Sequence, residues 1–415
     1  MAISTFAQWR LRVGGNDNNG GGFDPSIVGA GTDYTEQDVA QLALTDLATA
    51  SASASVTSAA GGFTAAMIGN AVRIVSGTNF TVGTYFITAV ASANAATLDR
   101  ACSTAAASGG VANVGGALAS FTRPAGVGAV NGNTIFVRGQ GSLNPVDIDY
   151  STAGIMTGPT NINYVGYNGR PKVAHNGILF NGHTNLVRGI FFVQTVGTNL
   201  TSGVTSGASG TVLIDCVLDS GGNDATQATA GTLIECLVMN SGNQTPGTRF
   251  AVVMSGSYYS RVVRTLIKDQ RGGGVSTDMT TYGNGVTDSI IQNCGGDGIA
   301  ITGTGAPKAS FTGNTIHGNA GHGINVGSVA AIVMNNLITG HTGSGKYGLF
   351  RSAAAASALD GQRFLGNNYH GNTDNSNYAL DATETTLDPQ YVNAPLDLTP
   401  TNLALRRLAG VGAPL

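Results

Sequence analysis

The chain has 415 residues, of which 42% are hydrophobic and 10% are charged, and it contains 62 glycines. The charged fraction lies well below the ~25% of typical soluble proteins, so Gly, Ser, Thr, Asn and Ala must form most of the surface. The formal net charge is −3 and no basic run is present, which excludes the electrostatic footprint of a nucleic-acid-binding protein. No apolar run approaches the ~18 residues of a membrane span, so we expect a soluble protein without a removable export signal.

Residues 1–40 are rich in Gly, Asn and Asp and contain few large apolar side chains. Ordering one residue costs ~1–2 kcal/mol of backbone entropy, whereas burying one large side chain returns ~1.5–3 kcal/mol. We therefore predict an extended N-terminal arm that a partner orders, with the aromatic residues Trp9 and Phe23 as its assembly contacts. The alternative is an arm that packs on its own chain as a lid.

Residues 41–125 are predicted to form a small β module with a linker. The stretch TEQDVAQLALTDLA begins at Thr35 and has apolar residues, Leu44 and Leu47 among them, at helical spacing, which predicts one short helix. The Ala/Ser tract ATASASAS that follows predicts a linker, or an extension of that helix. From Val56 to Arg100, short β-branched and aromatic runs alternate with Gly and Asn, which is typical of antiparallel strands.

A repeat of 20 to 30 residues dominates the next part of the chain. The segments RTLIKDQRGGGV, DSIIQNCGGDGI, GNTIHGNAGHGI and NNLITGHTGSGK start at Arg264, Asp288, Gly313 and Asn335, which are 24, 25 and 22 residues apart. Weaker copies start at Asp215, Glu235 and Gly366. In the first three segments an apolar pair precedes polar residues, glycines and a further apolar residue. The pattern indicates a parallel β-solenoid, in which coils stack ~4.8 Å apart.

These coil lengths and Asn-Gly corners resemble those of the right-handed parallel β-helix proteins, a group that contains pectate lyases, other polysaccharide-degrading enzymes and many phage spike proteins. The resemblance covers residues 131–380 and implies an all-β, right-handed parallel β-helix, which we place at residues 126–380. Residues 381–415 include DPQYVNAPLDLTPTNLALRR and resemble the segment that caps many such helices. The order of arm, β module, β-helix and cap is similar to that of phage-encoded virion proteins.

Four acidic residues are the weak candidates for catalytic groups: Asp215 with Glu235, which could be stacked neighbours, and Asp288 and Asp297, which form a second loose group with Asp269. Glycoside hydrolysis uses two carboxylates ~5–10 Å apart, which adjacent coils can supply. Elimination would instead use a basic residue, often beside a calcium ion held by clustered acids. No local cluster of acids has that form, and single solvent-facing charges explain the pattern equally well.

Three further features of the sequence are interpreted as parts of the fold and not as binding sites. In NTIHGNAGHGINV, His317 and His322 are expected at repeat positions, with the asparagines bonded along the column, because no ligand pair recurs at metal spacing. GHTGSGK matches the first seven positions of a phosphate-binding loop, but Tyr347 follows where Ser or Thr should hold magnesium. The four scattered cysteines are expected to be small buried hydrophobes. We expect no cofactor and no metal.

The sequence favours a non-enzymatic structural component of a phage virion, a surface-exposed decoration or spike protein. We expect a homotrimer that binds other virion proteins of the capsid or tail, is assembled in the bacterial cytoplasm and is exposed on the particle surface. The alternative is a tailspike that binds host surface glycan and cleaves it as a hydrolase or lyase. Under the first hypothesis, the purified protein releases no reducing ends or unsaturated products from host polysaccharide.

Overall fold

The computed structural model describes the chain in segments: residues 4–120, 123–126, 129–140, 148–150, 156–157, 161–175, 178–180, 186–194, 204–206, 210–220, 231–239, 250–254, 259–278, 283–302, 309–327, 330–351, 361–394 and 397–401. The chain divides into two compact units, Met1–Tyr150 with Gly158–Val173, and Ser151–Thr157 with Ala174–Leu415. None of the helices in the described segments has the length and apolar character needed to cross a membrane.

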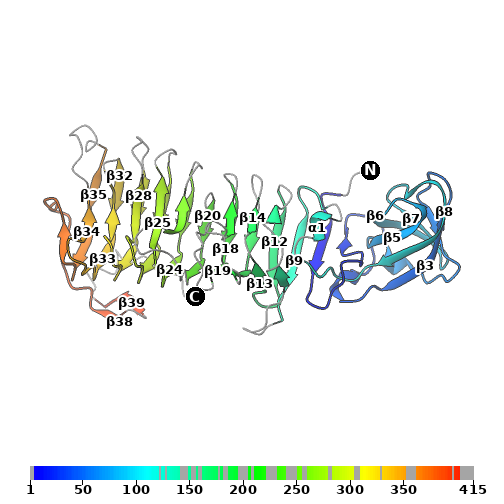
Figure 1. Cartoon of the computed structure of the whole chain (residues 1–415), viewed down its shortest axis with the longest axis horizontal. Coiled ribbons are helices and arrows are strands. Elements are labelled where there is room, and N and C mark those ends of the chain that lie inside the picture. The colour runs from blue at the N-terminus through cyan, green and yellow to red at the C-terminus, as the bar shows by residue number, and fades with distance from the viewer. Residues whose placement is uncertain are drawn as a thin grey trace. The chain divides into compact units, whose positions relative to one another are not determined.

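The first unit contains a closed antiparallel barrel (blue in Figure 1), with strand order β3-β4-β7-β6-β5-β8. Its interior is apolar, with Leu47, Ile74 and Ile87 fully buried. The strands are β3 (Leu42–Thr49), β4 (Ser55–Thr57), β5 (Ala71–Phe80), β6 (Gly83–Ser92), β7 (Ala95–Leu98) and β8 (Ser103–Val114). The short helices of this unit are η1 (Tyr34–Glu36), η2 (Ala65–Met67) and α1 (Arg123–Gly126).

The predicted helix in residues 35–48 is wrong, because this stretch forms η1 and then strand β3. Leu44 and Leu47 are three residues apart and both buried, which fits one face of a helix. In the barrel the same spacing arises because the pairing of β3 with β8 shifts register between Leu44 and Leu47. A bulge of this kind turns both side chains to one face. The Ala/Ser tract is the turn between β3 and β4, and neither a linker nor part of a helix.

The N-terminal arm is held by its own chain, which contradicts the expectation that a partner orders it. Strand β1 (Gln8–Leu11) pairs antiparallel with β2 (Gly22–Phe23) and parallel with β9 (Thr134–Arg138). Trp9 is fully buried, and its indole N–H donates to Asn133 Oδ1 at 3.0 Å. Phe23 is also buried.

The expectation that a partner orders the arm failed because it considered only the burial of side chains. Four backbone N–H groups of the arm, those of Arg12, Asn16, Gly20 and Gly21, donate to carbonyls of residues 115–118 at 2.9–3.0 Å. These hydrogen bonds offset part of the ordering cost. Because Trp9 and Phe23 are enclosed, they are not available as assembly contacts in this conformation. The remaining strands assigned to this region are β10 (Ile148–Tyr150) and β12 (Asn163–Tyr167), and β12 pairs parallel with β9.

The second unit is a right-handed parallel β-helix. The repeat predicted a parallel β-solenoid, and the resemblance to right-handed β-helix proteins implied its hand. The first sheet has the order β15-β18-β20-β23-β26-β29-β32-β35, with strands Leu186–Arg188, Val212–Ile214, Thr232–Ile234, Arg261–Val263, Gly285–Thr287, Ala309–Thr312, Ala331–Met334 and Arg363–Leu365. The second sheet has the order β16-β19-β21-β24-β27-β30-β33-β36, with strands Phe191–Gln194, Val217–Asp219, Leu237–Met239, Leu266–Lys268, Ile290–Gln292, Thr315–His317, Leu337–Thr339 and Asn368–His370. Strand β13 (Lys172–His175) precedes β16 along the chain.

The third sheet has the order β22-β25-β28-β31-β34-β37, with strands Phe250–Met254, Gly273–Asp278, Ile299–Thr302, Ile324–Asn325, Tyr347–Phe350 and Asp374–Ser376. Earlier coils carry the smaller sheet β11-β14-β17, with strands Met156–Thr157, Ile178–Phe180 and Val204–Ser206. Figure 1 shows the strands of successive coils side by side from green to orange.

The strand register matches the alignment of the repeats. Leu266 pairs with Ile290, Ile290 with Thr315, and Thr315 with Leu337. The central residue of each strand in the second sheet points into the column and is fully buried. This ladder comprises Phe192, Leu218, Val238, Ile267, Ile291, Ile316, Ile338 and Tyr369.

Each coil turns from the first sheet to the second at a residue with left-handed backbone, and we call this turn the first corner. Glycine and asparagine tolerate that conformation best, and aspartate is enriched there as well. The corner residues are Gly189, Asp215, Glu235, Arg264, Asp288, Gly313, Asn335 and Gly366, with φ between 45° and 68°. A second corner of the same kind joins the second sheet to the third at Asp269, Asn293, Gly318, Gly340 and Gly371.

A polar ladder runs inside the first corner. The backbone N–H of Ser289 donates to Asn314 Oδ1, that of Asn314 to Asn336 Oδ1, and that of Asn336 to Asn367 Oδ1, each at 3.0 Å. The prediction that asparagines bond along the column is confirmed. Cys216 and Cys236 occupy the equivalent positions in earlier coils, and all four cysteines are buried thiols outside any disulfide, as predicted.

The described part of the C-terminal segment closes the last coil. Glu384 is buried and accepts hydrogen bonds from Tyr369 Oη at 2.6 Å and from Asn367 Nδ2 at 3.0 Å. The hairpin of β38 (Tyr391–Asn393) and β39 (Asp397–Pro400) follows, and Tyr391 Oη lies 2.8 Å from Thr339 Oγ1 of the second sheet. Of the predicted capping segment 381–415, residues 402–415 lie outside the described residues.

Candidate functional site

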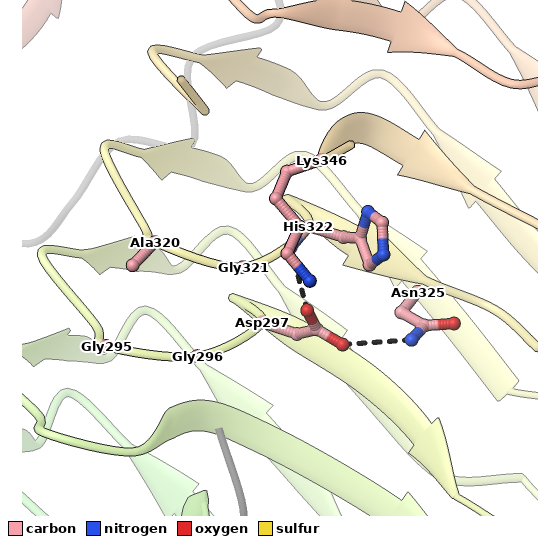
Figure 2. A pocket seen from close by; sticks show the side chains of 8 residues that line it. All are labelled: Gly295, Gly296, Asp297, Ala320, Gly321, His322, Asn325 and Lys346. Atoms are coloured by element: carbon pink, nitrogen blue, oxygen red, sulfur yellow. Dashed lines mark hydrogen bonds between the residues drawn. The ribbon is translucent and has the colours of Figure 1, made fainter. Parts of the chain in front are cut away.

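A polar pocket lies where successive coils leave the second corner and enter the third sheet (Figure 2). Its volume is about 330 Å³, the size of a small ligand site. Three consecutive coils contribute to it, ahead of β28, β31 and β34. The lining residues are Gly295, Gly296, Asp297, Ala320, Gly321, His322, Asn325 and Lys346.

The stacking of coils brings Asp297 and His322 together although they are 25 residues apart. Ile299 pairs with Ile324, and the N–H of Gly298 donates to the carbonyl of His322 at 2.9 Å. The two side chains therefore occupy the same position on neighbouring coils, about one strand spacing of ~4.8 Å apart along the column. Lys346 reaches the pocket from the third coil (Figure 2).

Asp297 is the acceptor at the centre of the pocket. Its Oδ1 accepts the backbone N–H of His322 at 2.7 Å, and its Oδ2 accepts Asn325 Nδ2 at 2.9 Å. Asn325 Oδ1 in turn accepts the N–H of Gly327 at 3.1 Å. The carboxylate is thus fixed by donors from the neighbouring coil, which preorganises it for a ligand.

The floor of the pocket requires glycine. A Cβ atom on Gly321 would lie 2.3 Å from Asp297 Oδ1 and 2.4 Å from the Asp297 backbone nitrogen. Any side chain at this position would therefore displace the carboxylate that the pocket presents. The glycines of the repeat are necessary here for close approach of one coil to the next.

His322 presents a neutral, aromatic wall. Its Nδ1 accepts the backbone N–H of Tyr347 at 3.0 Å, so this nitrogen carries no proton and Nε2 does. Burial lowers the pKa of His322, the Asp297 charge opposes that shift, and the Lys346 charge adds to it. The imidazole stacks on Phe350 with ring centroids 4.3 Å apart and planes at 12°.

The first pair of acidic candidates does come together. Asp215 and Glu235 occupy the first corner in successive coils, and Asp215 N–H donates to Ile234 O at 3.0 Å. However, Glu235 Oε1 already forms an ion pair with Arg264 Nη2 of the next coil at 2.8 Å. All three are corner residues with left-handed backbone, so their positions have a structural explanation.

The second pair is separated. Asp288 is an exposed first-corner residue, whereas Asp297 lies beyond β27 in the pocket. Of the four candidates, only Asp297 lines the pocket. The sequence alignment had placed His322 opposite Asp297, but as a repeat position and not as a binding residue.

Asn325 and Lys346 were not identified as site residues. Lys346 is the last residue of the segment GHTGSGK, which was considered only as a phosphate-binding loop. Strand β34 follows it directly, so no helix is there to bind a phosphate, in agreement with the rejection of that motif. Within the described segments no group of three metal-ligating side chains is present.

Comparisons with known proteins agree with the architecture. Residues 176–338 match the family model of the right-handed β-helix region. The fold is a right-handed parallel β-helix. The comparison with curated proteins gave no match.

Among solved structures, a pectate lyase is similar at 12% identity and a TM-score of 0.46, over 68% of this chain and 79% of that one. The catalytic unit of a thermostable α-1,3-glucanase from Streptomyces thermodiastaticus is similar at 10% identity and a TM-score of 0.31, over 86% and 91%. The tailspike of Acinetobacter baumannii bacteriophage AP22, in complex with a capsular saccharide, is similar at 9% and 0.22, over 83% and 62%. These likenesses concern the β-helix fold alone.

Proposed function

We propose that this protein is a surface-exposed β-helical component of a phage particle that binds a saccharide in the pocket around Asp297. The observation that carries the proposal is the convergence of a carboxylate, an amide, an ammonium group and a stacked aromatic wall from three consecutive coils.

The chemistry of the lining suits a polyhydroxy ligand. Hydroxyl groups both donate and accept hydrogen bonds, so they need acceptors such as Asp297 and donors such as Lys346 and Asn325 within one site. The His322 ring, which lines the pocket and stacks on Phe350, supplies an aromatic group at the same place. An apolar ligand would leave these polar groups desolvated and unpaired, at a cost in free energy.

The pocket supports binding better than cleavage. Glycoside hydrolysis uses two carboxyl groups around one bond, whereas the lining of the pocket contains one, Asp297. The pair Asp215 and Glu235 is the remaining candidate for a cleaving enzyme, and Glu235 is held by Arg264. The test is incubation of host polysaccharide with the protein and with Asp215→Asn. Products that disappear in the variant would replace binding with catalysis.

Substitution of Asp297 tests the binding site. Asp297→Asn keeps one acceptor oxygen for the His322 N–H, but the charge is lost and an amide nitrogen faces the Asn325 amide. We expect affinity for fragments of the host's surface polysaccharide to fall by about tenfold or more, as for a hydrogen bond to a charged group. Titration calorimetry measures the affinity, and circular dichroism verifies the fold.

Asp288→Asn is the matched control, because Asp288 lies on the same coil and outside the pocket. Its affinity should equal that of the unsubstituted protein. Equal affinities for both variants would remove the pocket from the proposed function.

The location of the protein is tested separately. Gold-labelled antibody on intact phage particles should mark the surface, and mass spectrometry of purified particles should detect the chain. A homotrimer and contacts with capsid or tail proteins remain part of the proposal, and chemical crosslinking of the particles tests both. A chain that is absent from washed particles would contradict the virion assignment without affecting the saccharide site.

A further inference from the structure

The hydrogen-bonding groups still available in the pocket are mainly donors. Both oxygens of Asp297, Oδ1 of Asn325 and Nδ1 of His322 already accept hydrogen bonds from the protein. Within the described residues, no ion pair or hydrogen bond engages the ammonium group of Lys346. The N–H on Nε2 of His322 is a second donor, since its Nδ1 is an acceptor.

Lys346 is positioned as part of the pocket and not as a freely extended surface lysine. Its side chain passes over the glycine turn before β34, where a Cβ on Gly343 would lie 2.8 Å from Lys346 Cγ. Figure 2 shows its side chain extending toward Asp297, and both residues line the pocket. The Asp297 carboxylate lines the same pocket, but within the described residues it forms no ion pair with Lys346, so the ammonium group can still pair with an anionic ligand.

Asp297 restricts which anion fits. An anion without a hydroxyl group would be repelled by the Asp297 carboxylate. An anion that carries a hydroxyl group next to its charge can donate a hydrogen bond to a remaining lone pair of that carboxylate. The site therefore matches a ligand that carries an acidic group next to hydroxyl groups. Sulfate at neutral pH has the charge without a hydroxyl donor, and the hydroxyl of hydrogen phosphate is on the charged group itself and not on a neighbouring atom.

We propose that the pocket selects a carboxylated sugar, whose carboxylate pairs with Lys346 while a hydroxyl of the same residue donates to Asp297. This inference rests on the proposed saccharide-binding function and names its substrate class. The recognition is a noncovalent ion pair with an adjoining hydrogen bond.

The experiment compares oligosaccharides that contain glucuronic acid with their carboxyl-reduced counterparts, in which glucose replaces the acid. We expect the full-length protein to bind the acidic form about tenfold or more tightly at low salt, the effect of one charge-assisted hydrogen bond. The preference should decrease when the Debye length is shortened from ~30 Å at 0.01 M to ~3 Å at 1 M salt. Binding is measured by calorimetry.

Variants assign the preference to one side chain. Lys346→Gln should lose most of the preference for the acidic form, and Lys346→Arg should retain much of it. Lys268→Gln is the matched control, because Lys268 lies on the second sheet beside Asp269 and outside the pocket, and it should bind as the unsubstituted protein does. Each variant's thermal midpoint verifies that it folds.

The outcomes distinguish the selection of a carboxylated sugar from saccharide binding itself. Equal binding of acidic and reduced oligosaccharides would overturn the selection of a carboxylated sugar and leave saccharide binding intact. A preference that survives Lys346→Gln would overturn the role of this lysine. Absence of binding to either form and to host polysaccharide fragments would overturn the proposed function itself.

Discussion

Replacing Asn336 with alanine is expected to lower the free energy of unfolding by about 3–5 kcal/mol, because buried polar groups of the neighbouring coils lose partners worth ~1–3 kcal/mol each. Asn336 is completely buried at the first corner. Its Oδ1 accepts the backbone N–H and the side-chain amide of Asn314 at 3.0 and 2.9 Å. Its Nδ2 donates to the carbonyl of Phe311 and to Asn367 Oδ1, each at 2.9 Å.

The loss is large because alanine replaces neither the acceptor nor the donor at a site without solvent exposure. Urea unfolding followed by circular dichroism gives the free energy. The neighbouring substitution Asn335→Gly is the control: Asn335 is exposed, has φ of 56°, and stands where the adjacent coils have Gly313 and Gly366. It should change stability by no more than about 0.5 kcal/mol. Similar losses in both variants would mean that the ladder contributes little.

Acidification is expected to destabilise the β-helix through His341. This residue follows the second corner, is fully buried, and its ring nitrogens lie 3.1 Å from the carbonyl of Asn319 and 3.3 Å from that of Ile316. Burial lowers the pKa of His341 to about 4 from 6.5, although the two carbonyls favour the charged ring. Desolvation of a fully enclosed imidazolium outweighs two neutral acceptors.

The direction of the effect follows from proton binding. Above pH 6.5 the imidazole is neutral in both states, so it adds no pH dependence. As the pH falls from 6.5 to about 4, the unfolded chain binds a proton that the folded chain does not, and stability decreases. At 1.36 kcal/mol per pKa unit, the loss approaches about 3 kcal/mol. Below about pH 4 the folded state also binds the proton, and the loss stops growing.

His341→Asn isolates this contribution. The equivalent positions in the adjacent coils are Asn319 and Asn372, so asparagine fits the row. Whatever its stability at neutral pH, the variant should lose less stability between pH 7 and pH 4 than the unsubstituted chain. The same substitution at the partly exposed His370 should leave the pH dependence in place. Parallel stability profiles for His341→Asn and the unsubstituted protein would show that His341 is not the group responsible.

The architecture could be predicted from the sequence because its information is local and repeated. The inward apolar residue of each coil, such as Ile291 and then Ile316, recurs in the same register, and a left-handed corner residue precedes it each time. A stacked coil has the same neighbours as the one before it, so one alignment fixes strand pairing, core and polar ladder together.

The N-terminal region could not be predicted in this way. Leu44 and Leu47 have a spacing that fits both a helix and a bulged strand, and only the pairing of β3 with β8 decides between them. Trp9 was identified as an anchor from its side chain, but its partner Asn133 is 124 residues away. Contacts at that sequence distance leave no local signal.

The sequence by itself determined the coil period, the inward apolar ladder, the asparagine row and the burial of the cysteines, because each depends on the repeated pattern of residues one coil apart. Only the tertiary structure decided that the arm pairs with its own chain, that Asp288 and Asp297 are apart, and that Asp297, His322 and Lys346 meet. Asp297 and His322 occupy equivalent positions of their coils, but in the third coil Tyr347 occupies that position and Lys346 precedes it by one residue. A site assembled from different positions of successive coils has no periodic signature, so it becomes visible only when the coils are stacked.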